Sequence, residues 1–206
     1  MSRRPDPGRK PELVAQILDY LLDKPLSGLT FRTLATGLGV STFTLVYHFG
    51  TRAELLSEIV EAISGRETGI HENLVVNPAS VEAYVDGLRS SWLWTLQARN
   101  RQLQRLEFEA AMIEALNPDG HVFVRSLFAR WQRVVYEALL SFGMVPEEAE
   151  EESRLVVDTF YGIQFDLLLN GDDQRASDAF ARAVALHWDR IADLIGPRVS
   201  RTGSLG

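Results

Sequence analysis

Apolar residues recur along this chain at intervals of three and four residues, the spacing that gathers them on one side of an α-helix. In residues 11–24, for example, Leu13, Ile17, Tyr20 and Leu21 form one such stripe. Few segments alternate between apolar and polar residues as a half-buried strand would. We therefore predict an all-α fold, with helices over residues 11–24, 30–36, 41–49, 51–70, 80–96, 101–116, 120–142, 146–170 and 177–195.

Two of the shortest predicted helices lie next to each other and are separated by the glycine-containing stretch "GLGV". Thr30 and Ser41 stand where each begins, and a hydroxyl there can accept a hydrogen bond from a free backbone N–H. Thr51 and Glu54 form a capping box at the start of the next helix. Two short helices joined by a tight turn predict a helix-turn-helix, whose second helix enters the DNA major groove.

The segment "LTFRTLATGLGVSTFTLVYHFGTRAELL" resembles the DNA-binding segment of the TetR family of transcriptional regulators. The resemblance is specific over about residues 11–60; beyond them it rests on helix count, length and order. The positions that match the family pattern are Thr30, Leu34, Ala35, Gly39, Val40, Ser41, Thr44, Leu45, His48, Phe49, Arg52 and Leu55.

This resemblance implies an N-terminal three-helix helix-turn-helix DNA-binding domain followed by a larger helical ligand-binding and dimerisation domain (about nine helices). We expect an N-terminal arm and the DNA-binding domain in residues 1–52 and a connecting helix in 53–72. The ligand-binding and dimerisation domain should cover residues 73–196, and a disordered tail residues 197–206.

The resemblance, together with helix position, assigns the DNA contacts. Leu45 and Phe49 are four residues apart and should pack inward with Leu34 and Val40, so Phe43 should point outward. An exposed phenylalanine suits thymine methyl groups, although it could instead contact the rim of the first helix. The expected DNA-contacting residues are Thr30, Ser41, Thr42, Phe43, Thr44, Tyr47, His48 and Arg52.

Three positions depart from the family pattern, and two expected contacts have structural alternatives. Val46 stands where the family usually has Tyr, and Thr42 and Phe43 stand where Lys and Gly are frequent. A phosphate-contacting hydroxyl and a charge are therefore missing from this segment. Thr30 serves as a helix cap with or without a phosphate, and His48 could instead hold the start of the next helix.

Charge is distributed unevenly along the chain. Residues 1–52 contain seven Lys and Arg against four acidic residues, a formal charge of +3, while the whole chain carries −7. A basic N-terminal segment would attract a polyanion and an acidic remainder would repel it. This asymmetry is consistent with DNA binding through the N-terminal segment, although ordinary solvated surfaces could also produce it.

The helices after residue 80 carry many aromatic residues, most of which belong to a helical core in any such protein. The family has a ligand cavity among the corresponding helices, and a mostly apolar small molecule would suit these side chains. If a cavity exists here, its expected walls and polar anchors are Trp92, Phe108, Glu109, Met112, His121, Phe128, Trp131 and Phe165.

The last two helices, about 146–170 and 177–195, are the expected homodimer interface. The segment "LVVDTFYGIQFDLLLN" is apolar around most of its circumference, which is more than one packed side requires. Gly162 within it costs about 1 kcal/mol relative to Ala, which suggests a close approach of another helix. The alternative is that this helix is the buried centre of a monomer.

Motifs of enzymes, metal sites and membrane proteins are not found. The four histidines are scattered, cysteine is absent, and no phosphate-binding glycine loop or nucleophile motif occurs. We expect no catalytic residue, metal or cofactor, and no membrane contact because no apolar run approaches about 18 residues. An all-helical enzyme using Glu109 and His121 is the remaining alternative. The expected location is the cytoplasm.

Together these features predict a ligand-responsive DNA-binding regulator, not an enzyme. Its expected partners are double-stranded DNA, a second copy of itself and a small-molecule effector. We expect a repressor that a mostly apolar small molecule releases from a palindromic operator. The alternative is a helical ligand-binding or interaction protein with degenerate DNA binding, which Val46 and Thr42 suggest. The sequence leaves the effector, the operator and the choice between repressor and activator open.

Overall fold

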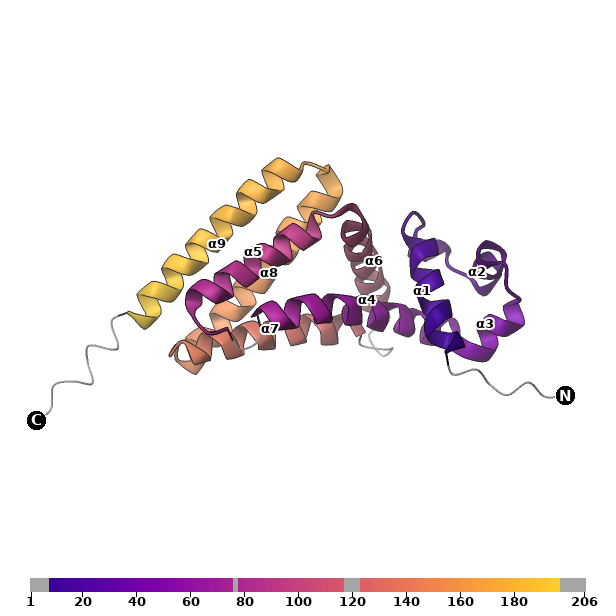
Figure 1. The fold of residues 1–206 in the computed structure, drawn as a ribbon, viewed down its shortest axis with the longest axis horizontal. Helices are drawn as coiled ribbons and strands as arrows, with labels where there is room; N and C mark the ends of the chain where they lie inside the picture. Colours follow the sequence, from indigo (N-terminus) through magenta and orange to yellow (C-terminus); the bar gives the residue numbers. More distant parts are fainter. Residues whose placement is uncertain (1–7, 76–77, 117–122, 197–206) are drawn as a thin grey trace, which may run out of the picture. The chain divides into compact units, whose positions relative to one another are not determined.

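The computed structural model describes residues 8–75, 78–116 and 123–196, and over these residues every regular element is helical (Figure 1). The elements in chain order are α1 (Arg9–Leu21), the 3-10 turn η1 (Leu26–Gly28), α2 (Phe31–Leu38), α3 (Thr42–Phe49), α4 (Arg52–Val75), α5 (Val81–Thr95), α6 (Ala98–Ala115), α7 (Phe123–Ser141), α8 (Pro146–Asn170) and α9 (Asp173–Ile195). The predicted all-α fold is confirmed.

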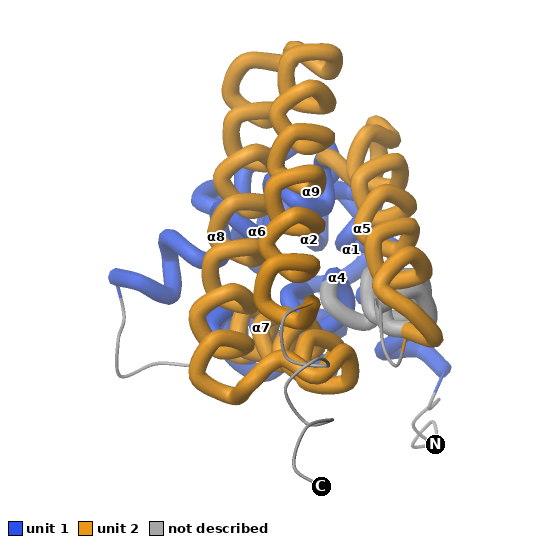
Figure 2. Tube along the Cα trace, turned by 90° about the vertical axis from the view of Figure 1, so that its left-hand side faces the viewer, with its two compact units in different colours: residues 1–66, 102–125 blue, residues 67–101, 126–206 orange. Residues whose placement is uncertain are grey.

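The chain forms two compact units, which Figure 2 shows in different colours. Unit 1 contains residues 1–66 and 102–125, and unit 2 contains residues 67–101 and 126–206. In this division most of α6 groups with α1–α4. The reason lies in the α6 residues Leu103, Leu106 and Ala110, whose side chains are buried in the same core as those of α1.

Unit 1 has one hydrophobic core that fixes the three short N-terminal helices. α1 contributes a stripe of four buried residues, Leu13, Ile17, Leu18 and Leu21. From α2 and α3, Leu34, Leu45 and Phe49 are each at most 2% exposed. The inward positions expected from the helical spacing are therefore confirmed, with Val40 partly buried at the edge of the core.

Unit 2 is built around α5, α8 and α9. α8 is followed by the capping residue Gly171, whose φ of 65° lies in the left-handed region that favours glycine. The chain then turns and α9 packs beside α8 (Figure 2). α9 begins at Asp172, whose side chain accepts a hydrogen bond from the Arg175 N–H. The predicted start at Ser177 was therefore wrong, because an aspartate cap stands five residues earlier.

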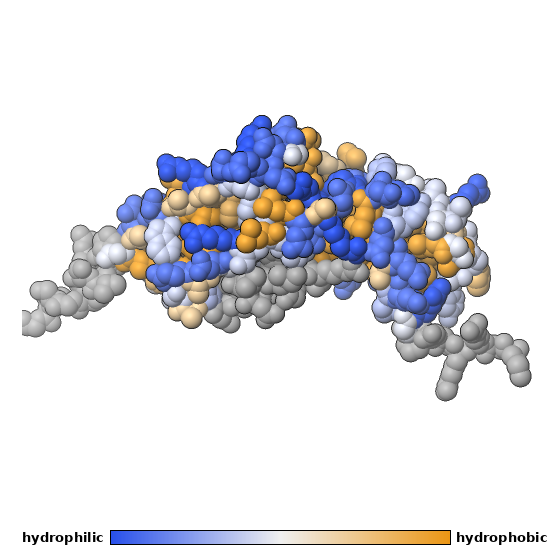
Figure 3. Space-filling model, turned by 45° about the horizontal axis from the view of Figure 1, so that its top comes forward, coloured by the Kyte–Doolittle hydropathy of each residue, from blue (hydrophilic) through white to orange (hydrophobic). Residues whose placement is uncertain are grey.

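No helix in the described part of the chain has the length and apolar character needed to cross a lipid bilayer. On the face that Figure 3 presents, apolar side chains reach the surface in several places among hydrophilic ones. The large apolar side chains that are exposed in the described part of the chain include residues of α3, α8 and α9.

Candidate nucleic-acid interface

The α2–α3 motif is held by side-chain caps at the start of both helices. The Thr30 hydroxyl accepts the Thr33 N–H at 3.1 Å, and the Thr33 hydroxyl accepts the Thr30 N–H at 3.0 Å. At α3, the Ser41 hydroxyl accepts the Thr44 N–H at 3.0 Å. Gly39, with a φ of 66°, makes the turn between the helices in a conformation that a residue with a Cβ rarely adopts. The two helix starts predicted at Thr30 and Ser41 are confirmed.

α3 has one buried and one exposed side. Leu45 is 0% exposed, while the side chains of Phe43, Tyr47 and Val46 point to solvent with exposures of 78%, 61% and 44%. Since burying a phenylalanine side chain stabilises a fold by about 1.5 to 3 kcal/mol, an exposed Phe43 contributes little to folding. It does not pack into the core, and its position leaves it available to a partner.

The aromatic side chains of α3 contact one another along the exposed side. The rings of Phe43 and Tyr47 stack with centroids 6.4 Å apart. The Tyr47 ring meets the His48 ring edge-on at 5.1 Å. These contacts restrict the rotamers of Phe43 and Tyr47 before any partner binds, and so reduce the entropy lost on binding.

Arg52 has a structural role in addition to the phosphate contact expected of it. Its Nε donates to the Leu29 carbonyl at 3.0 Å, and a terminal nitrogen reaches the Leu26 carbonyl at 3.5 Å. The adjacent capping box is confirmed, since Thr51 N–H donates to Glu54 at 2.6 Å and Glu54 N–H donates to the Thr51 hydroxyl at 3.2 Å. Arg52 thus ties the start of α4 to the loop that leads into α2.

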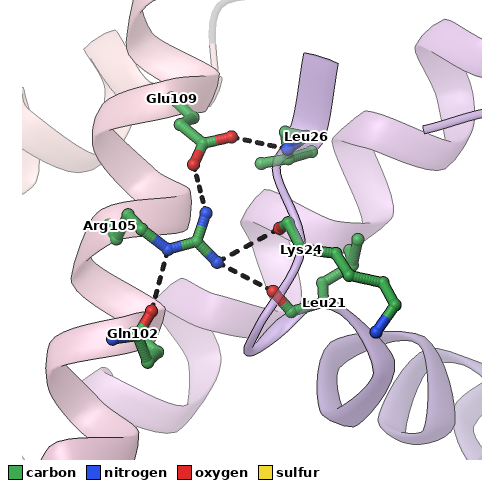
Figure 4. A network of polar contacts seen from close by, with 6 residues as sticks. All are labelled: Leu21, Lys24, Leu26, Gln102, Arg105 and Glu109. Carbon is green, nitrogen blue, oxygen red and sulfur yellow. Dashed lines mark hydrogen bonds and ion pairs between the residues drawn. The ribbon is translucent and has the colours of Figure 1, made fainter. Parts of the chain in front are cut away.

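A second set of polar contacts holds that loop from α6, and Figure 4 shows it. A terminal nitrogen of Arg105 donates to the carbonyl of Leu21, the last residue of α1, at 2.8 Å, and to that of Lys24, three residues later, at 3.2 Å. The other terminal nitrogen pairs with Glu109. Glu109 in turn accepts the Leu26 N–H at 2.5 Å. We call Arg105 and Glu109 the α6 clasp.

Arg105→Ala should lower the free energy of unfolding by about 2 kcal/mol, because the carbonyls of α1 and the Glu109 carboxylate each lose a charged partner. Arg133→Ala is the matched control, since Arg133 also pairs with a glutamate four residues later, Glu137, but both side chains are more than half exposed. It should change stability by less than about 0.5 kcal/mol. Urea unfolding measures both, and equal losses would contradict a role for the clasp.

The residues expected to line a ligand cavity divide between the two units. Trp92 stacks on Phe180 of α9 with centroids 4.7 Å apart and donates to the Ser177 hydroxyl at 3.0 Å, while Phe128 packs on Tyr161. These residues and Trp131 belong to the packed part of unit 2. Phe165, also in unit 2, is 47% exposed.

In unit 1, Glu109 is engaged in the clasp rather than left as a polar anchor. Met112 is 63% exposed, and Phe108 is half-buried. His121 lies outside the described residues. The structure therefore gives Glu109 and Trp92 partners within the protein, and the contact of any of these residues with a ligand stays a prediction.

A buried polar cluster in unit 2 was not predicted. The Tyr84 hydroxyl lies 3.0 Å from Nε2 of His187, and Nδ1 of His187 lies 3.9 Å from Glu152. Arg190 donates to Glu152 at 2.8 Å, so the buried carboxylate is paired. Burial lowers the pKa of His187 to about 4 and raises the pKa of Tyr84 well above its ordinary value. His187 is consequently neutral near pH 7.

The sequence held little that would have revealed this cluster or the clasp. The members of the cluster come from α5, α8 and α9, and 103 positions separate Tyr84 from His187 along the chain. Arg105 and Glu109 are four residues apart, a spacing also typical of a solvated surface pair. Among the described residues, no group of three His, Cys, Asp or Glu side chains is placed to hold a metal ion.

We compared the chain with known proteins by sequence and by structure. No protein-family model matches the chain, and no curated protein is significantly similar to it in sequence. Solved structures, however, match over most of its length. A transcriptional regulator from Rhodococcus sp. Rha1 superposes with a TM-score of 0.75 at 17% identity, covering 87% of this chain and 96% of the other.

Two further solved structures extend this comparison. A TetR transcriptional regulator from Legionella pneumophila matches with a TM-score of 0.65 at 12% identity, over 88% and 97% of the two chains. The multidrug binding protein EbrR, solved in complex with imidazole, matches with a TM-score of 0.58 at 22% identity, over 86% and 96%. The chain therefore has the fold of TetR-type regulators, as the α2–α3 segment suggested.

Proposed function

We propose that this protein is a ligand-responsive transcriptional regulator, a homodimer that represses from a palindromic operator and is released by a mostly apolar small molecule. The observation that carries the proposal is the α2–α3 motif, with a capped second helix whose outer side is solvent-exposed, within the fold of TetR-type regulators. The protein would act in the cytoplasm, where it meets chromosomal DNA, and without catalysing a reaction.

The expected DNA contacts lie on the exposed parts of α2, α3 and the start of α4. The N-termini of α2 and α3 favour phosphate oxygens because their first backbone N–H groups and the helix dipole are positive. The side chains of Thr42, Phe43, Tyr47 and His48 would enter the major groove or follow its edge. Arg32 of α2 is also exposed and would supply a cation to the phosphates.

Homodimerisation is supported by an exposed apolar stripe on α8 and α9. On α8, Leu155 is 61% and Leu169 is 67% exposed, and Gly162 lies between them at helical spacing. A Cβ at Gly162 would meet no atom of the chain within 4 Å, so this small residue leaves room for a second helix. Leu186 of α9, 52% exposed, lines the same groove as Leu155.

The effector would bind among the helices that carry aromatic side chains. EbrR, which shares the fold, was solved with imidazole. Release from DNA would follow if the effector preferred a state in which the two α3 helices are wrongly spaced for successive major grooves. α4 connects the DNA-binding helices to the rest of the chain, and the α6 clasp adds a second connection to the α1–α2 loop.

The second candidate function, a ligand-binding protein with degenerate DNA binding, is suggested by Val46 and Thr42 on α3. Neither side chain supplies the phenolic hydroxyl or the charge frequent at these positions in the family. Salt dependence of duplex binding distinguishes the two candidates, because a DNA-binding regulator releases counterions from phosphates.

The affinity for duplexes from upstream of the coding gene should fall about a thousandfold or more between about 50 and 200 mM salt. Arg32→Ala should lower the slope of log affinity against log salt by about 1, because it removes one phosphate contact. Arg89→Ala, which removes an exposed arginine of α5 paired with Asp86, should leave the slope unchanged. Fluorescence anisotropy measures the affinity of the unaltered protein and of both variants at each salt concentration. A flat salt dependence of the unaltered protein would favour the second candidate.

A further inference from the structure

The composition of α3 restricts which bases it can recognise. The helix runs from Thr42 to Phe49 with the sequence TFTLVYHF, and it contains no Arg, Lys, Asn or Gln. Bidentate contacts to guanine come from Arg or Lys, and those to adenine from Asn or Gln. The commonest direct contacts to purine edges are therefore unavailable to this helix, although its exposed side is the one placed to enter the groove.

What α3 offers instead is an apolar surface. Phe43 is 78% and Val46 is 44% exposed, and the Phe43 ring stacks on Tyr47. Residues 43, 46 and 47 are three and four positions apart, so they share one side of the helix. In the major groove, the only apolar group that a base pair presents is the C5-methyl of thymine.

The polar side chains of α3 do not change this conclusion. The Thr44 hydroxyl lies 2.8 Å from that of Ser41, within the cap of the helix. Thr42 stands at the first position of the helix, where its hydroxyl can hydrogen-bond to more than one base. His48 makes its ring contacts with Tyr47 and Phe49. The hydroxyls of Thr42 and Tyr47 can hydrogen-bond to more than one base, whereas the apolar surface of α3 favours thymine alone.

We propose that α3 recognises thymine through its C5-methyl groups, with Phe43 and Val46 as the specificity-determining residues and Tyr47 supporting the Phe43 ring. This inference rests on the proposed function. It adds the chemical class of the operator, in which each half-site carries thymine at the steps that face α3. Replacing such a thymine by deoxyuridine removes the methyl group and leaves every hydrogen-bonding group in place.

The test begins with selection of duplexes from a random pool by the full-length protein. Each thymine of the selected half-site is then replaced by deoxyuridine in turn. We expect the affinity to fall about fourfold for each contacted thymine, since a buried methyl group contributes about 0.8 kcal/mol. Phe43→Ala should bind the thymine duplex more weakly and lose its sensitivity to deoxyuridine at the position that Phe43 contacts.

Tyr47→Phe keeps the stacked ring and removes only the hydroxyl. Any loss of affinity that follows should be equal for the thymine and the deoxyuridine duplexes, so the ratio of the two affinities should stay as in the unaltered protein. Phe43 is exposed, so Phe43→Ala should fold normally, and circular dichroism verifies this.

Equal affinity for thymine and deoxyuridine duplexes, or selection of half-sites without thymine, would overturn the inference and leave the proposed function standing. Failure to select any sequence would overturn the proposed function itself.

Discussion

Leu186→Glu should convert the proposed dimer into a monomer and weaken its binding to a palindromic duplex by a hundredfold or more. The side chain of Leu186 is half exposed and lines an apolar groove of about 390 Å³ between α8 and α9, together with Leu155 and Phe160. A carboxylate buried there by a second copy would lose its hydration, and Arg190, the arginine that lines the groove, is already paired with Glu152. A monomer binds only one half-site. Loss of the second half-site contact lowers the affinity for the duplex by a factor of about 10² to 10⁴.

The matched control is Leu93→Glu on α5, where the leucine is 65% exposed but lies outside this groove. This variant should remain a dimer and keep its affinity for DNA. Analytical ultracentrifugation gives the oligomeric state, and fluorescence anisotropy gives the affinity. If Leu186→Glu remained a dimer with unchanged affinity, the α8–α9 groove would not be the interface.

The second large effect concerns pH. The pKa of His187 is lowered from 6.5 to about 4 by burial, and Glu152, 3.9 Å from the ring, is already paired with Arg190. Between these two values the unfolded chain binds a proton that the folded chain does not. The free energy of unfolding should therefore fall as the pH is lowered from 6.5 toward 4, by about 3 kcal/mol in total.

His187→Gln isolates this contribution, because an amide can donate a hydrogen bond to the Tyr84 hydroxyl or accept one from it but does not titrate. The difference in unfolding free energy between protein and variant removes the contribution of the carboxylates that titrate in the same range. Urea unfolding at fixed protein concentration should show this difference changing steadily between pH 6.5 and 4. A constant difference would contradict a buried, neutral histidine.

The features of this molecule that depend on near neighbours in the chain were accessible from the sequence. Thr30, Ser41 and Thr51 were expected to cap helices and do so, because each hydroxyl accepts a hydrogen bond from the N–H group three positions later. Phe43 was expected on the outer side of α3 because the inner positions were already assigned by helical spacing, and it is exposed.

Contacts across long separations were not accessible in the same way. Nothing in the local pattern shows that Arg105 donates to carbonyls at the end of α1, more than 80 positions earlier. Ser177 was predicted to start the last helix, yet it lies inside α9 and accepts a hydrogen bond from Trp92. In both cases tertiary packing determines the hydrogen-bond partner. The local pattern of a single sequence does not reveal such packing.

The measurement that tests the central claim most directly is hydroxyl-radical footprinting of the full-length protein on duplex DNA from upstream of its coding gene. A dimer that places two α3 helices in successive major grooves should protect two half-sites related by a palindrome, about 10 base pairs apart from centre to centre or a multiple of that spacing. Phe43→Ala should weaken both protections equally. Uniform protection without half-sites, or none at salt concentrations near physiological, would contradict the account.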